Sequence, residues 1–318
     1  MNSTFDPALC TYATCSVDIY GQLTYIPSLG GNLLYLSIFG LAFTVHIGLG
    51  IRYHTWGFKI GMLGGIALEI MGYVARVELH YDVFNRTYFI IYLVGLTIGP
   101  AFFSGAIYIC LARIIAVYGT ETSPLTGRTI TMIFIGCDFI SLVLQAGGGA
   151  LTSLDISSSL NQTGIDIMIA GLASQVASMT AFCCICIQII FTIHTRPGIV
   201  NRNSTGLRKN VRFRLFLIAV GIATIAILIR CSFRVAELSE GFGSDLANNE
   251  VMFMVLDGAM MVIAVLVLTI GHPGPALGVA WKNGGFKFWK SRQPQTGHHH
   301  GHLQQATLLT SDAGKAAH

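Results

Sequence analysis

The sequence predicts an all-α fold, an integral membrane bundle of seven transmembrane helices with the N-terminus outside and the C-terminus in the cytosol. The first observation is the composition, since 53% of the 318 residues are hydrophobic and only 11% are charged. Soluble domains carry about 25% charged residues. The second observation is length, because the apolar residues form runs near or above the roughly 20 residues that cross a core of about 30 Å as a helix.

Each apolar run supplies one predicted helix, and short polar loops join the helices without an inserted soluble domain. The predicted spans are 29–51, 58–80, 88–117, 129–151, 165–193, 212–236 and 250–271. They form one transmembrane domain, 29–271, after an extracellular N-terminal segment, 1–28. The remaining segment, 272–318, is predicted to be cytosolic, with basic and aromatic residues beside the membrane and then a disordered tail.

The distribution of Lys and Arg predicts the orientation, because cytoplasmic loops retain basic residues. Most of them gather in four segments on one side of the predicted topology, 52–59, 113–128, 196–214 and 282–315. On the other side only Arg86 lies in a loop. The basic side is therefore expected in the cytosol against anionic lipid, and the charge gives no indication of a nucleic-acid partner.

The first 28 residues contain neither Lys nor Arg nor a long apolar run. No cleavable signal peptide is therefore predicted, and the first helix serves as its own insertion signal. In an oxidising compartment Cys10 and Cys15 are expected to form a disulfide, with two free thiols as the alternative. Four sequons occur. Asn203 is predicted in the cytosol and Asn85 and Asn161 close to the bilayer surface, so Asn2 is the predicted glycosylation site.

Glycine and proline predict irregular packing in the third span and close helix contacts elsewhere. Pro100 cannot donate to the carbonyl of Leu96, and Gly99 loosens the same turn, so we expect a kink there. Small residues in "GMLGG" and "QAGGGA" allow two helices to approach closely. The alternative is that they leave a gap for a ligand.

Polar residues inside the membrane are costly and usually face a bundle interior or a watery cavity. Here they occur on five predicted helices: Glu69, Arg76, Asp138, Gln145, Gln175, Arg230, Arg234, Glu237 and Asp257. Counting about 1.5 Å per residue places one group near the middle of the membrane, Glu69, Asp138, Gln175 and Asp257. The same count places a second group about 10 Å nearer the outer surface, Arg76, Gln145, Arg230 and Arg234, with Glu237 above them.

Two interpretations of these residues remain open. In the first, they line a polar cavity open toward the outer leaflet, where the arginines bind a phosphate or carboxylate head and Asp138 or Glu69 binds a cationic amine. In the second, pairs such as Glu69 with Arg76, or Asp257 with an arginine, are buried ion pairs that fix helix register.

Five motifs resemble the fungal RTA-like family of lipid-translocating exporters, named for aminocholesterol resistance. They are "EIMGYVAR", "IGPAFFSGAIYICLARII", "DFISLVLQAGGG", "RCSFRVAELSEG" and "FMVLDGAMM" leading to "GHPG". The resemblance covers about Tyr25 to Pro273. It implies a seven-helix fungal membrane protein linked to export of sphingoid long-chain bases, resistance to toxic amphiphiles and porphyrin traffic. The family's motif positions fall on Glu69, Arg76, Asp138, Gln145, Arg230, Arg234, Glu237 and Asp257.

The leading functional prediction is translocation or export of amphipathic lipids, sphingoid-base-like or sterol-like, with membrane lipids and amphipathic small molecules as partners. No P-loop pattern is present, so facilitated exchange or proton coupling through an acid such as Glu69 or Asp138 is expected. No enzymatic activity, cofactor or metal is predicted, and protein partners are not specified by the sequence. The predicted location is the plasma membrane, with a vacuolar or other internal membrane as the alternative.

Two other functions remain as alternatives. A lipid receptor or sensor fits seven helices with an outer N-terminus, although that likeness is one of form alone. An intramembrane hydrolase with zinc would need three convergent ligands, usually histidines. His46, His194 and His272 are predicted near the inner ends of their helices and His80 near an outer end, without a paired spacing.

Overall fold

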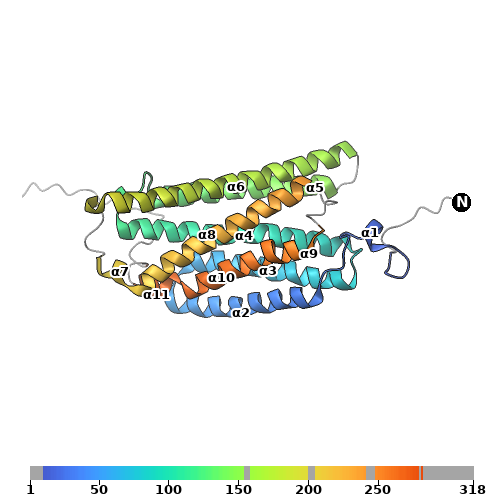
Figure 1. The fold of residues 1–318 in the computed structure, drawn as a ribbon, viewed down its shortest axis with the longest axis horizontal. Coiled ribbons are helices and arrows are strands. Elements are labelled where there is room, and N and C mark those ends of the chain that lie inside the picture. Colours follow the sequence, from blue (N-terminus) through green and yellow to red (C-terminus); the bar gives the residue numbers. More distant parts are fainter. Residues whose placement is uncertain (1–9, 154–157, 200–204, 241–247, 279–280, 282–318) are drawn as a thin grey trace, which may run out of the picture. The chain divides into compact units, whose positions relative to one another are not determined.

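The protein is described here by a computed structural model, which covers residues 10–153, 158–199, 205–240, 248–278 and 281 (Figure 1). All of them belong to one compact unit, Met1–Gly284. Seven helices are long and apolar enough to cross a membrane, and no strand occurs in the described ranges. The predicted all-α bundle of seven spans is confirmed. Its orientation in the membrane stays a prediction.

The helices that cross the bundle are α2 (Leu29–Tyr53), α3 (Trp56–Tyr81), α4 (Arg86–Tyr118), α5 (Gly127–Ser153), α6 (Ser158–Thr195) and α8 (Val211–Glu240). The last span is composite, with α9 (Glu250–Met252), the π-helical segment η5 (Phe253–Ala259) and α10 (Met260–Ile270). Most predicted bounds agree within a few residues, but α6 begins at Ser158 and not at residue 165. Short helices were not predicted: α1 (Val17–Tyr20), α7 (Thr205–Lys209) and α11 (Pro273–Leu277), and the 3-10 turns η2 (Thr120–Thr122) and η3 (Pro197–Ile199).

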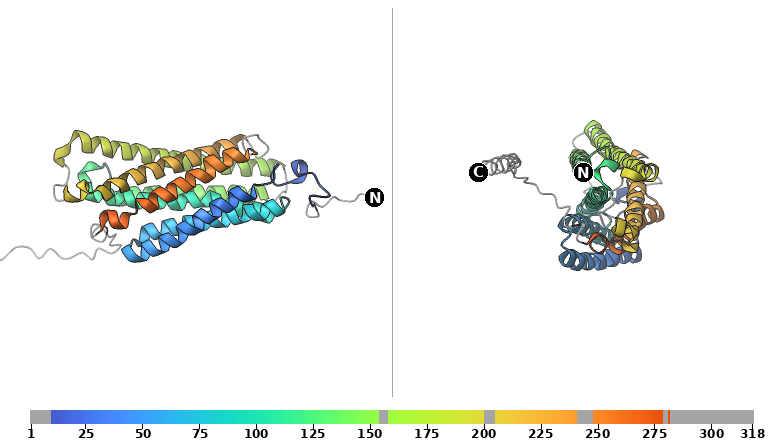
Figure 2. Two further views of the ribbon diagram at one scale, coloured as in Figure 1. Left: turned by 60° about the horizontal axis from the view of Figure 1, so that its bottom comes forward. Right: turned by 90° about the vertical axis from the view of Figure 1, so that its left-hand side faces the viewer.

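Helix α4 lies at the centre of the bundle and packs against α3, α5 and α8. Viewed along the helices, α2 and α3 occupy one side, α5 and α6 the opposite side, and α8 with α10 a third (Figure 2). Two contacts depend on glycine. A Cβ at Gly95 would lie 2.8 Å from the carbonyl oxygen of Leu68, and one at Gly148 would lie 2.5 Å from that of Gly164. Close approach therefore explains the small residue at 148.

The segment before α2 is fastened to the end of α3. Cys10 and Cys15 form a disulfide. Within this loop the Tyr12 hydroxyl donates to the carbonyl of His80 at 2.9 Å, and it accepts from the backbone N–H of Val83 at 3.3 Å. We call this end of the bundle, where α2 starts and α3 ends, the N-terminal end.

The predicted glycosylation site, Asn2, and the predicted tail lie outside the described residues. A second sequon asparagine, Asn85, is the N-cap of α4. Its side-chain oxygen accepts from the backbone N–H groups of Thr87 and Tyr88, which are among the donors that the start of a helix leaves unpaired.

Apolar side chains cover much of the outside of the bundle, while ionisable ones lie within it. Leu41, Phe139 and Ile270 are 69%, 65% and 77% exposed, whereas Glu69, Arg76 and Asp257 are 0% exposed. Such a distribution is stable when hydrocarbon surrounds the helices. The membrane argument made from the sequence therefore matches the packing of the bundle.

Candidate functional site

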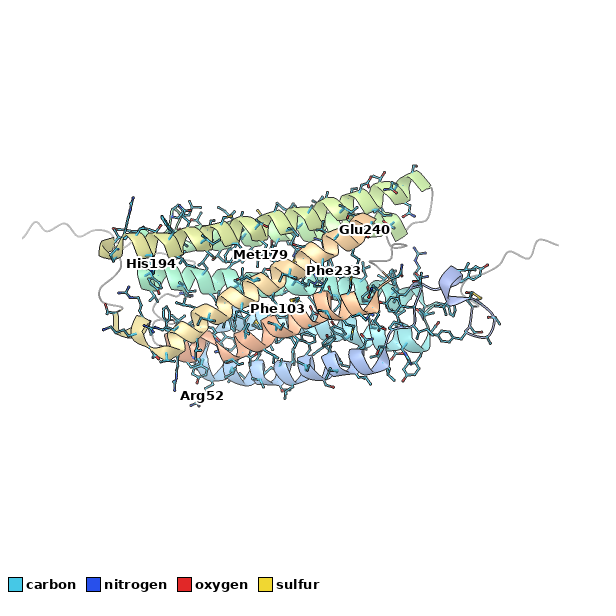
Figure 3. All side chains as sticks on the ribbon, viewed as in Figure 1. Arg52, Phe103, Met179, His194, Phe233 and Glu240 are labelled. Atoms are coloured by element: carbon cyan, nitrogen blue, oxygen red, sulfur yellow. A yellow bond between two sulfur atoms is a disulfide. The ribbon has the colours of Figure 1, made fainter. Side chains whose placement is uncertain are left out.

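A cavity of about 630 Å³ lies toward the N-terminal end, bounded mainly by α4, α5, α6 and α8. Much of its wall is apolar, including Phe89, Leu93, Ile98, Leu142, Met168 and Leu172. The polar residues on the wall are Gln22, Arg86, Thr97, Gln145, Thr152, Asn161, Arg234, Glu237 and Asn248. Three predicted site residues therefore line the cavity, namely Gln145, Arg234 and Glu237. Figure 3 shows Phe233 and Glu240, which flank the two charged residues on α8, in the half of the helix nearest this end.

The charged residues that α8 contributes to the cavity wall are Arg234 and Glu237. They are three residues apart on α8 and therefore share a face of the helix. Nη1 of Arg234 donates to Oε2 of Glu237 at 2.6 Å, and its Nε lies 3.7 Å from Oδ1 of Asp257. One arginine thus contacts an acid on the cavity wall and an acid behind it.

Arg230, one turn earlier on α8, does not line the cavity. Its Nε lies 2.9 Å from Oδ1 of Asp257, in the geometry of an ion pair without an aligned hydrogen bond. Its Nη2 donates to the carbonyl oxygen of Leu96 in α4. Leu96 stands four residues before Pro100, which has no N–H for that carbonyl. Arg230 therefore connects α4, α8 and the π-helical segment.

Arg230, Asp257, Arg234 and Glu237 form one continuous ion network that ends at the cavity. Two positive charges balance two negative charges, which limits the cost of burying them. Arg230 fits the interpretation in which ion pairs fix helix packing. Arg234 and Glu237 fit both interpretations, because they are paired and also face the cavity.

The second interpretation includes an ion pair between Arg76 and Glu69. The structure shows no such pair. Nε of Arg76 donates to Oδ1 of Asn32 and its Nη2 to the Tyr25 hydroxyl, each at 3.1 Å. The guanidinium also lies 3.9 Å from the ring centre of Phe253. Asn32 and Tyr25 were not predicted. Asn32 is a lone Asn in an otherwise apolar helix, and this could have indicated a buried polar contact.

Glu69 is buried against α4. Neither of its carboxyl oxygens has a hydrogen-bond partner in the described part of the chain. A Cβ on Gly99 would lie 2.9 Å from Oε1 of Glu69, so Gly99 makes room for this carboxyl group. Helix α4 is one continuous helix that includes Pro100. The predicted kink stays a prediction.

Asp138, Gln145 and Gln175 lie where α5 meets α6. Oδ2 of Asp138 accepts from the Tyr108 hydroxyl at 2.9 Å. Nε2 of Gln145 donates to Oε1 of Gln175 at 3.2 Å, and only Gln145 of these residues also lines the cavity.

The predicted separation into two levels is wrong for Gln175 and Asp257. Gln145 contacts Gln175 directly, and Arg230 contacts Asp257, although the count of helical rise had placed the members of each pair about 10 Å apart. The predicted heights of Gln175 and Asp257 were counted wrongly. Counted from the cytosolic ends of the predicted spans, Gln145 and Gln175 lie about 24 and 27 Å along their helices, and Arg230 and Asp257 about 27 and 21 Å. The direct contacts agree with these heights.

The histidines do not form a metal site in the described residues, where no group of three or more His, Cys, Asp or Glu could hold an ion. His46 and His272 nevertheless lie together, with ring centres 6.1 Å apart. A ring nitrogen of His46 is 2.9 Å from the Thr269 hydroxyl, and Nδ1 of His272 accepts from the backbone N–H of Gly274. These contacts pack the end of the bundle opposite the cavity.

The fold and the cavity define a multi-pass, all-helical membrane protein with a charged cavity in one half of its bundle. The chain belongs to the RTA1-like family, whose model, described as "RTA1 like protein", matches residues 62–279. The resemblance seen in the motifs is therefore confirmed.

Several relatives come from Saccharomyces cerevisiae. The sphingoid long-chain base transporter RSB1 is 33% identical over 290 residues, which cover 82% of this chain and 75% of that protein. Protein RTA1 is 27% identical over 277 residues, covering 78% and 84%. Protein RTM1 is 26% identical over 218 residues, covering 68% of each chain. No solved structure shows significant similarity to the chain.

Proposed function

We propose that this protein translocates an amphipathic lipid with a sphingoid-base-like head and chain from the inner to the outer leaflet. The observation that carries the proposal is a cavity of about 630 Å³ with largely apolar walls and one ion pair, Arg234 with Glu237, on the wall. An amphiphile needs both surfaces at once. The relative RSB1, a sphingoid long-chain base transporter, supports the same substrate class.

The charged wall favours a head with an amine and hydroxyl groups. Glu237 is the carboxylate among the cavity-lining residues described, and a protonated amine can replace Arg234 as its partner. Arg234 would keep its contact with Asp257 during that exchange and would therefore retain a carboxylate partner. The amide of Gln145 can bond a hydroxyl group, and the apolar wall can hold the first methylenes of the alkyl chain.

The proposed orientation places the cavity in the outer half of the membrane, because it lies at the N-terminal end and the N-terminus is expected outside. This position suits release to the outer leaflet. Location in the plasma membrane and tolerance of toxic amphiphiles, including sterol-like ones, follow as parts of the same proposal.

The test is reconstitution of the purified chain into liposomes that carry a fluorescent sphingoid base in the inner leaflet. Appearance of the base at the outer leaflet is followed by quenching with an impermeant reagent. We expect faster transfer than in protein-free liposomes and in liposomes with an unrelated seven-helix protein. Saturable binding without transfer would instead support a receptor or sensor, and neither binding nor transfer would contradict the proposed substrate class.

A further inference from the structure

The interface between α5 and α6 carries a series of polar side chains that starts at the cavity. Gln145, Ser141 and Asp138 lie four and seven residues apart, and therefore on one face of α5. Gln145 bonds Gln175 at 3.2 Å, and the hydroxyl groups of Ser141 and Ser174 lie 2.6 Å apart. Asp138, about 10 Å farther from the cavity than Gln145 by helical rise, is the last of the three.

These side chains keep hydrogen-bonding capacity that the described residues do not use. No aligned hydrogen bond engages Oε1 of Gln145, Nε2 of Gln175, Oγ of Ser178 or Oδ1 of Asp138, although the Ser178 hydroxyl faces the Asp138 carboxyl group. The four residues are 6%, 3%, 9% and 4% exposed, so all are at least nine-tenths buried. Buried polar groups in hydrocarbon surroundings require partners, and water entering from the cavity can supply them.

Asp138 differs from Asp257 and Glu237 in its surroundings. Asp257 and Glu237 contact arginines, whereas no lysine or arginine forms an ion pair with Asp138 within the described ranges. The titratable groups that face Asp138 are the phenol of Tyr108 from α4 and the thiol of Cys231 from α8, while α6 presents the hydroxyl of Ser178. A buried carboxyl group without a cation can bind a proton in its place.

We propose that Asp138 is a proton-binding site that couples lipid translocation to proton movement, with the polar series from Gln145 to Ser141 as its connection to the cavity. The inference rests on the proposed function. A proton from the cavity side forms an O–H bond at Oδ1 of Asp138, and this bond breaks when the proton leaves toward the opposite end. No other bond changes, and one proton moves inward for each lipid moved outward.

The position of Asp138 fits this role better than that of Glu69. The Tyr108 hydroxyl that bonds Asp138 also lies 3.7 Å from the sulfur of Met179, which Figure 3 shows near the middle of the bundle's length. A mid-membrane carboxyl group can be reached from each end in turn. Glu69 has no hydrogen-bonded neighbour in the described residues that leads to the cavity.

The experiment measures proton movement and lipid movement in the same proteoliposomes, with a pH-sensitive dye inside and a fluorescent sphingoid base. In the wild-type protein a gradient of one pH unit should drive about tenfold accumulation of the base at one proton per lipid. Lipid added without a gradient should change the internal pH. Asp138→Asn should abolish both the accumulation and the pH change.

Two further variants make the result decisive. Asp166→Asn replaces an exposed acid of α6 and should behave as the wild type. Ser141→Ala interrupts the polar series without touching Asp138, and it should slow the pH change even if Asp138→Asn fails to fold. Transport by the wild type that ignores the gradient, or a normal pH response in Ser141→Ala and folded Asp138→Asn, would overturn the proton site and leave the proposed function intact. Absence of all transport would overturn the proposed function.

Discussion

Arg230 of α8 donates through Nη2 to the carbonyl oxygen of Leu96 in α4. This is the carbonyl that Pro100 leaves without a helical donor, since proline has no N–H. The same guanidinium pairs with Asp257 at 2.9 Å. A proline in one helix thus explains an arginine in another, and Arg230 acts as a connection between helices.

A double-mutant cycle tests this connection. Arg230→Lys keeps a positive charge beside Asp257 but loses the donor to the Leu96 carbonyl. It should therefore lower the free energy of unfolding by about 1–3 kcal/mol. With Pro100→Ala the backbone N–H can pair with Leu96, and the loss caused by Arg230→Lys should be smaller by about 1 kcal/mol. The measurement is thermal melting in detergent. Simple additivity of the two changes would show that they do not act on one carbonyl.

Gly99 provides a second packing test. Gly99→Ala places a Cβ 2.9 Å from Oε1 of Glu69 and should cost about 1–3 kcal/mol by overpacking. Glu69→Asp shortens the opposing side chain and should recover part of that loss. The matched control is Gly105→Ala on the same helix, where a Cβ meets nothing within 4 Å. Equal melting temperatures for Gly99→Ala and Gly105→Ala would argue against the contact.

Arg234 distinguishes ligand binding from packing. Arg234→Lys keeps one positive charge but cannot contact both Glu237 and Asp257 with a planar fork, so transport should fall about tenfold at unchanged surface abundance. Arg212→Lys, an exposed arginine at the other end of α8, should have no effect. The checks are surface labelling and the liposome transfer rate. Full transport by Arg234→Lys would exclude this arginine from the site, and low abundance would assign it to packing.

The sequence predicted the spans and the interior polar residues because charged side chains in hydrocarbon must face inward. It identified the unpaired carbonyl of Leu96, but its partner on α8 depends on helix packing. The role of Asn32 beside Arg76 was missed for the same reason. The π-helical segment was also missed, since one extra residue in a turn leaves no clear mark on an apolar run.

Orientation is the prediction on which the direction of transport depends. A protease site placed after Arg292 should be cut from the cytosolic side, and a tag beside Asn2 should be reached from outside, because the basic loops are expected in the cytosol. Intact cells and inverted vesicles provide the two sides of this measurement. Detection of both ends from one side would contradict seven spans in the predicted orientation.

Passage of the lipid through the cavity can be tested by filling the cavity at Gly149. Gly149 lines the cavity, and a Cβ there has its nearest neighbour, the Met168 sulfur, at 3.8 Å, so the Cβ of Gly149→Phe has room and the ring adds bulk at the cavity wall. Gly147 on the same helix is exposed, and a Cβ there meets nothing within 4 Å. The initial rate of sphingoid-base transfer in liposomes should fall about tenfold or more for Gly149→Phe and stay near the wild-type rate for Gly147→Phe. Wild-type transfer by folded Gly149→Phe, or equal losses in both variants, would contradict passage through the cavity.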